Sequence, residues 1–121
     1  MNIEKFREYC LSLGDDVTEK TPFGKFARKY ESILVFYVRG HMFCLIDIDD
    51  FRFVDVCSTP DEVMQLKAEY LSVSNPANPS LRHWIQLYFN GDISDEQILE
   101  LVRRAYDIIN DRYAPKRLKK P

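Results

Sequence analysis

Residues 31–50, ESILVFYVRGHMFCLIDIDD, contain two apolar runs separated by Arg39 and Gly40. Two apolar runs joined by such a short turn predict a β-hairpin, with Gly40 supplying the dihedral angles that the turn requires. Residues 51–57, FRFVDVC, follow a polar connection and predict a third strand. Because strands joined by hairpins pair antiparallel, this part of the chain restricts the fold to one built on an antiparallel sheet.

Both faces of the predicted hairpin are apolar. The first strand places Ile33, Val35 and Tyr37 on one face, and Leu34, Phe36 and Val38 on the other. A sheet with one solvated face would instead alternate apolar with polar residues. The second face is therefore also covered, either by irregular segments of this chain or by another chain. A homodimer is one hypothesis that would cover it.

Two capped segments predict helices near the ends of the chain. Residues 3–13 space their apolar side chains by three and four positions, and Asn2 can cap this helix. Residues 94–113 repeat the spacing, with Ser94 and Gln97 as a capping box at the start and Pro115 beyond the end.

A third helix is predicted after the FRFVDVC strand. Thr59 stands at the cap, Pro60 at the first helical position, and Glu62 is placed to complete another capping box. Val63 and Leu66 begin its expected buried face.

The remaining segments are a loop and a strand. Residues 71–81 contain two prolines and two asparagines, which predict a loop with at most one short edge strand. Residues 83–92 predict the last strand, which ends at Asn-Gly-Asp.

The order of elements is helix, three strands, helix, strand, helix. Helices segregated from an antiparallel sheet predict an α+β fold of two layers, with terminal and middle helices. The length predicts a single domain over residues 1–121, with a basic C-terminal tail at residues 114–121.

Composition narrows the class of protein. The chain is 45% hydrophobic and 13% aromatic, which suits a globular core rather than a disordered chain. No apolar run approaches the roughly 20 residues of a membrane span, and the charged N-terminus is unlike a signal peptide. Cys10, Cys44 and Cys57 form no CxxC pair, so we expect reduced thiols in a cytoplasmic protein.

Charge is distributed unevenly along the chain. The last ten residues carry five cations and no acid, whereas the other 111 residues carry 12 basic and 19 acidic groups. The first set sums to +5 and the second to −7. A basic tail can attract nucleic acid, although an acidic body repels it except at a local basic patch. The alternative is a solubilising C-terminus without a specific role.

The sequence offers few groups for catalysis or metal binding. His41 and His83 are its only imidazoles, and it has no glycine-rich phosphate loop and no HExxH motif. The cysteines and histidines lack zinc-site spacing, and the acids of DIDD, at residues 47–50, are typical of a solvated turn. We therefore expect no enzyme activity, metal, cofactor or small-molecule substrate.

The stretch LRHWIQLYFNGD, residues 81–92, contains the single tryptophan, Trp84. If the strand begins at His83, then His83, Ile85 and Leu87 share the core face, and Trp84 lies on the other face with Gln86. Trp84 then either packs over that second face or forms a platform that binds a partner. Packing is favoured, because tryptophan is usually largely buried.

The motifs and their order resemble the MmcQ/YjbR family of small bacterial proteins. The matching pieces are FREYCLSL, TPFG, VRGHMFCLIDIDD, PDEVMQLKAEY, HW, and NGD followed by DEQILELVRRAYDII. The resemblance implies a fold related to that of frataxin and CyaY, and a DNA-binding function. The chain departs from the family pattern at Ile85, where an asparagine is typical, and at Asp55, where a lysine is common.

Two hypotheses for function follow. The first is a non-catalytic DNA-binding protein that uses basic residues of the tail and hairpin together with the Trp84 region. Its candidate residues are Arg39, Arg82, Trp84, Lys116, Arg117, Lys119 and Lys120. The second is a protein- or ligand-binding module that uses an apolar sheet face around Trp84, with a homodimer as one form.

Overall fold

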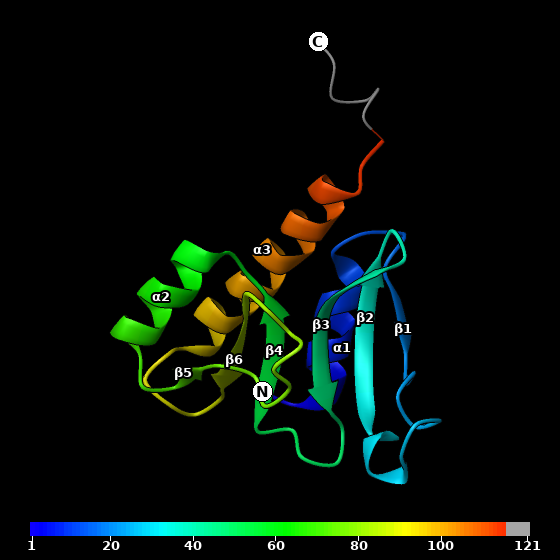
Figure 1. The fold of residues 1–121 in the computed structure, drawn as a ribbon, viewed down its shortest axis with the longest axis horizontal. Helices are drawn as coiled ribbons and strands as arrows, with labels where there is room; N and C mark the ends of the chain where they lie inside the picture. The colour runs from blue at the N-terminus through cyan, green and yellow to red at the C-terminus, as the bar shows by residue number, and fades with distance from the viewer. Residues whose placement is uncertain (116–121) are drawn as a thin grey trace.

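The computed structural model describes residues 1–115 and contains three helices on one six-stranded sheet (Figure 1). The elements are α1 (Ile3–Ser12), β1 (Thr18–Lys20), the 3-10 turn η1 (Arg28–Tyr30), β2 (Ile33–Val38), β3 (His41–Asp47), β4 (Phe53–Cys57), α2 (Pro60–Glu69), β5 (Val73–Ser74), β6 (Trp84–Tyr88) and α3 (Asp95–Arg112). The strand order is β1-β2-β3-β4-β6-β5, and every neighbouring pair is antiparallel. The predicted two-layer α+β fold is confirmed.

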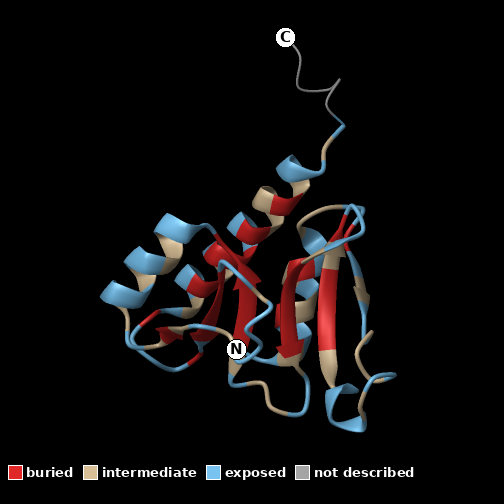
Figure 2. Ribbon diagram, in the orientation of Figure 1, coloured by how far each residue is buried: buried red, intermediate tan, exposed pale blue. Residues whose placement is uncertain are grey.

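The main core lies between the sheet and the two terminal helices. The ring of Phe6, on α1, lies 6.1 Å from that of Phe36, on β2. The ring of Tyr106, on α3, lies 5.7 Å from that of Phe43, on β3. Figure 2 shows the central strands almost entirely buried, with exposed residues on the outer sides of the helices. Burial of these apolar side chains is the dominant stabilising contribution to such a fold.

The predicted caps of both terminal helices are confirmed. Asn2 Oδ1 accepts a hydrogen bond of 2.8 Å from the Lys5 N–H at the start of α1. Ser94 and Gln97 form the complete capping box of α3. Each cap satisfies N–H groups that the first helical turn leaves without an intrahelical partner.

The capping box predicted for α2 is only half formed. Thr59 Oγ1 accepts a 3.3 Å bond from the Glu62 N–H, as expected. The Glu62 carboxylate instead accepts a 2.6 Å bond from the Ser58 hydroxyl and pairs with Arg104 of α3 at 2.7 Å. The predicted bond from the Glu62 side chain back to the Thr59 backbone is absent, because the Glu62 carboxylate is engaged by Ser58 and Arg104. The ion pair with Arg104 also connects α2 to α3.

The expected buried face of α2 is confirmed only in part, because Val63 and Leu66 pack against the core without being fully buried. No residue of this helix is fully buried, and Val63 and Leu66 are half-buried. The helix lies at one edge of the molecule, in contact with β5, and so does not cover the centre of the sheet (Figure 1).

The structure adds a strand that the sequence pattern did not predict. β1 pairs with β2, with Lys20 opposite Val35. Its residues, Thr-Glu-Lys, show no apolar alternation, so only the pairing partner defines the strand. The predicted short edge strand in the 71–81 segment is confirmed as β5.

An irregular segment of this chain covers part of the second face of the sheet. Val35 is fully buried and Leu45 is 7% exposed, although α1 and α3 lie on the opposite face. Residues 75–83 cross in front of β4 and β6 in Figure 1, and Leu81 from this segment packs against the core. This segment covers the β4–β6 side of the second face, whereas Ile33, Tyr37 and Phe53 on the same face are half-buried.

Across residues 1–115, no helix has the length and apolar character needed to cross a membrane.

Candidate functional site

Three separate segments of the chain each place an arginine at the same end of the sheet. The β2–β3 turn, at Arg39 and Gly40, lies at this end, and the register places the start of β3 beside the end of β4. The end of β4 in turn lies beside the start of β6, with Cys57 opposite Trp84. We call this region, defined by Arg39, Arg82 and Arg112, the arginine end.

Arg39 connects the hairpin to the last turn of α3. Its φ is +52° and that of Gly40 is +76°, so the two residues form the tight turn predicted from the sequence. The Arg39 Nε donates to the backbone oxygen of Asn110 at 3.2 Å and to its Oδ1 at 2.9 Å. A cation is favourable there, because the carbonyl end of a helix carries partial negative charge.

The C-terminal turn of α3 brings a second arginine to this end. His41, on β3, stacks on Tyr113, with ring centroids 3.4 Å apart. Burial raises the pKa of Cys57. Arg112 lies close enough for its positive charge to lower the pKa of this thiol and so offset part of that rise. The exposed Arg112 is one of the five cations counted in the last ten residues, but it was not a candidate site residue, because only the fold brings it beside β4.

Arg82 and His83 lie outside the last strand, which begins one residue later than predicted. Both side chains are exposed, and His83 has a φ of +63°. The His83 carbonyl accepts a 2.8 Å bond from the Ser58 N–H. The prediction that His83 shares the core face is therefore wrong, because this turn redirects the chain before β6 starts.

Trp84 belongs to the packed interior, as the favoured interpretation held. It is 9% exposed, and Gln86, on the same face, is 7% exposed. Ile85 and Leu87, on the opposite face, are fully buried, so the predicted alternation along this strand is confirmed from Trp84 onward.

Trp84 also forms part of a groove of about 580 Å³ between the start of α2 and residues 75–83. Its apolar lining residues are Pro60, Val63, Met64, Pro76, Pro79, Leu81 and Trp84, and its polar ones are Asn75, Asn78, Arg82 and His83. The lining contains no carboxylate. Arg82 therefore belongs both to this groove, which we call the Trp84 groove, and to the arginine end.

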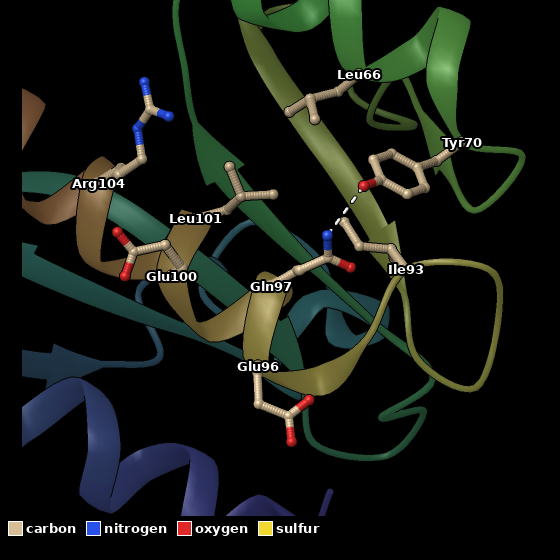
Figure 3. A pocket seen from close by; sticks show the side chains of 8 residues that line it. All are labelled: Leu66, Tyr70, Ile93, Glu96, Gln97, Glu100, Leu101 and Arg104. Carbon is tan, nitrogen blue, oxygen red and sulfur yellow. Dashed lines mark hydrogen bonds between the residues drawn. The ribbon is translucent and has the colours of Figure 1, made fainter.

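A smaller pocket, of about 290 Å³, lies between α2 and α3 (Figure 3). Leu66 and Leu101 line it, and the Tyr70 hydroxyl accepts a 3.0 Å bond from Gln97 Nε2. Arg104, at its edge, is already paired with Glu62 of α2. Since its arginine and its tyrosine–glutamine pair are engaged with each other or with neighbours, we treat this pocket as a packing gap between two helices.

The arginine end is not uniformly positive. Asp16 and Asp107, as well as Arg39, lie near enough to Tyr106 to act on its pKa, which burial raises most. The chain has 17 basic and 19 acidic residues, and four of the basic ones lie in residues 116–121, so the described residues carry a net charge of −6. The candidates Lys116, Arg117, Lys119 and Lys120 lie outside the described residues.

Asp55 does not place its charge at the arginine end. It is 5% exposed, in the middle of the second sheet face, opposite Leu45 and Gln86. Burial raises the pKa of Asp55 to about 6, and a hydrogen bond from Gln86 opposes part of that rise. Its Oδ1 has no hydrogen-bond partner.

In the described part of the chain, the thiols are buried and no cluster of ligands for a metal ion is present. Cys10, Cys44 and Cys57 are free and buried, and burial raises the pKa of Cys44 well above its ordinary range. Within residues 1–115, no group of three or more His, Cys, Asp or Glu side chains is placed to hold a metal ion.

Comparison with known proteins identifies the family of this chain. A family model described as YjbR matches residues 11–108. The chain belongs to the YjbR family. This confirms the resemblance drawn from the ordered motifs.

Solved structures with the same fold come from two bacteria. A Deinococcus radiodurans protein with the domain DUF419 has a TM-score of 0.80 at 22% identity, over 99% of this YjbR-family chain and 89% of its own. A Pseudomonas syringae protein, as a crystal structure, has a TM-score of 0.68 at 20% identity, over 90% of this chain and 99% of its own. A solution structure from the same organism has a TM-score of 0.64 at 20% identity, over 90% of this chain and 93% of its own. No curated protein matches the chain.

Proposed function

We propose that this YjbR-family protein is a non-catalytic DNA-binding protein of the cytoplasm, which contacts the phosphate backbone through the arginine end and the basic tail. The observation that carries the proposal is that Arg39, Arg82 and Arg112 belong to segments that end at the same end of the sheet. Residue 115, which precedes the four cations of the tail, follows α3 at this same end. Phosphate binding needs such clustered arginine and lysine side chains.

Electrostatics sets the expected character of this binding. Each cation that neutralises a phosphate releases counterions, and the logarithm of affinity then falls with the logarithm of salt concentration by about 0.9 per phosphate. The net charge of −6 on the described residues opposes the approach of DNA from any other side. Binding should therefore be confined to the arginine end and strongly salt-dependent.

Buried thiols and the placement of the imidazoles support the remaining parts of the proposal. The three cysteines are free, as is usual in a reducing compartment. His41 stacks on Tyr113 and His83 occupies a turn, so each imidazole has a structural explanation that requires no catalytic partner.

The test is a titration of a short labelled DNA duplex, followed by fluorescence anisotropy at several salt concentrations. Arg39→Ala and Arg82→Ala should each weaken binding at low salt and reduce the salt slope by about 0.9. Lys5→Ala is the matched control, because this exposed cation lies in the first turn of α1, away from the arginine end.

Two results would overturn the proposal: no binding at low salt, or equal effects of all three substitutions. Circular dichroism of Arg39→Ala checks that the loss of its bonds to Asn110 has not unfolded α3.

A second candidate function rests on the Trp84 groove, which is mostly apolar. A protein-binding module would use it to take an apolar side chain of a partner. Binding of that kind depends on buried apolar area and changes little with salt, which separates it from phosphate contact.

A further inference from the structure

We propose that the Trp84 groove binds an unpaired nucleobase, so that the protein prefers single-stranded DNA to a duplex. This inference rests on the proposed DNA-binding function and specifies the form of DNA that is bound. It arises from the composition of the groove and from the position of Arg82, which the groove shares with the arginine end.

The walls of the groove suit the apolar face of a base. Trp84 closes one side, while Pro60 and Pro79 contribute rigid apolar surface from α2 and from the 75–83 segment. Contact between a base and apolar or aromatic side chains is tolerant of sequence, because every base has a π-face. A groove of about 580 Å³ has room for a base and part of its sugar.

Two asparagines supply hydrogen-bond donors to the groove. Asn75 Oδ1 already accepts from Lys67 Nζ at 3.2 Å, and Asn78 Oδ1 accepts from the Ser80 N–H at 3.0 Å. Each side chain also has an NH₂ group, and within residues 1–115 neither NH₂ has a hydrogen-bond partner. Such donors match the ring nitrogens and carbonyl oxygens at the edge of a base.

Charge favours a nucleotide over an ordinary apolar side chain of a protein. The lining carries Arg82 and no acid, and within the described chain Arg82 forms no ion pair. A phosphate attached to the bound nucleotide can therefore pair with Arg82. In a duplex the base is stacked and paired, and extruding it costs free energy that an unpaired base does not require.

Trp84 makes the test direct, because it is the only tryptophan in the chain. Its fluorescence reports occupancy of the groove, whereas anisotropy of a labelled DNA reports binding anywhere on the protein. A thymidine oligonucleotide should change the Trp84 emission in step with its binding. A duplex of equal length should bind more weakly and leave the emission nearly unchanged.

Met64→Glu tests the groove itself. Met64 lines it and is 73% exposed, so a glutamate there should fold normally and repel the strand. Leu71→Glu is the matched control, because Leu71 is 96% exposed, lies outside the groove and gains the same charge. Loss of one stacked base predicts about tenfold weaker oligonucleotide binding for Met64→Glu, with little change for Leu71→Glu.

The outcomes separate this inference from the function on which it rests. If DNA binds by anisotropy while the Trp84 emission stays unchanged, or if both glutamate variants weaken binding equally, the groove is not the site and the proposed phosphate contact stands. If neither form of DNA binds at low salt, both proposals fail. Coincident thermal unfolding of the two variants confirms that folding is not the cause.

Discussion

At the scale of single residues, the carboxylate of Asp55 is placed where a charge is costly. It is 5% exposed, its Oδ1 has no partner, and the Gln86 side chain provides its hydrogen bond. Burial therefore favours the neutral acid and raises the pKa of Asp55 to about 6, from an ordinary value of about 3.9. The sequence showed that an acid occupies this position, but only the structure shows that the acid is buried.

This buried acid predicts that stability falls as pH rises. Between about pH 4 and pH 6 the folded chain keeps a proton that the unfolded chain has released, so the free energy of unfolding decreases over this interval. A pKa rise of two units corresponds to about 3 kcal/mol. Asp55→Asn keeps an acceptor for Gln86 but leaves its NH₂ unpaired, which offsets part of the gain. We expect this variant to be about 1–2 kcal/mol more stable than the parent near pH 7.5.

Urea denaturation at about pH 4.5 and about pH 7.5 measures the effect. The gain should nearly vanish at the lower pH, where the folded parent is already neutral at this position. Asp49→Asn, which removes an exposed carboxylate from the β3–β4 connection, should show no comparable dependence. An equal gain at both pH values would show that ionisation of Asp55 is not its source.

At the scale of elements, short sequence motifs correctly predicted the features that depend only on neighbouring residues, namely helix caps and a turn. The caps at Asn2 and Ser94 and the Arg39-Gly40 turn lie within a few residues of the elements that they define, and the structure confirms them. The Glu62 carboxylate behaves differently because its partner Arg104 is distant in sequence and adjacent only in the fold.

The candidate site also depends on contacts between residues that are distant in sequence. Arg39, Arg82 and Trp84 could be picked out by residue type, but the chain direction at His83 depends on its carbonyl meeting the Ser58 N–H. The Trp84 groove forms only where α2 and residues 75–83 come together. No spacing within either segment signals a groove, so the sequence suggested a sheet face instead.

The α2 helix should be the least protected of the three. It has no fully buried residue, whereas α3 buries five, and the Glu62–Arg104 pair fastens it to α3. Local opening costs least where few apolar contacts are lost. We expect α2 amides to exchange with deuterium faster than those of α3, and Glu62→Gln to speed exchange in α2 alone.

Hydrogen exchange followed by mass spectrometry measures this difference. Glu100→Gln is the control, because the carboxylate of Glu100 pairs with Arg103 within the same helix. It removes an ion pair without releasing α2. Equal protection of α2 and α3 in the parent chain would contradict the assignment of α2 as a weakly held edge element.

At the scale of the whole molecule, the basic tail offsets an acidic body. Removal of residues 114–121 takes away four cations and leaves a body of net charge −6. If those cations contact phosphates, the salt slope of DNA binding should fall by about 3.6, more than for either Arg39→Ala or Arg82→Ala. A full-length variant with glutamine at Lys116, Arg117, Lys119 and Lys120 should lose as much affinity as the truncation, because the contribution is charge rather than length. If the glutamine variant instead retains the parent slope, the tail takes no part in phosphate binding, and the three arginines at the sheet end must account for all of it.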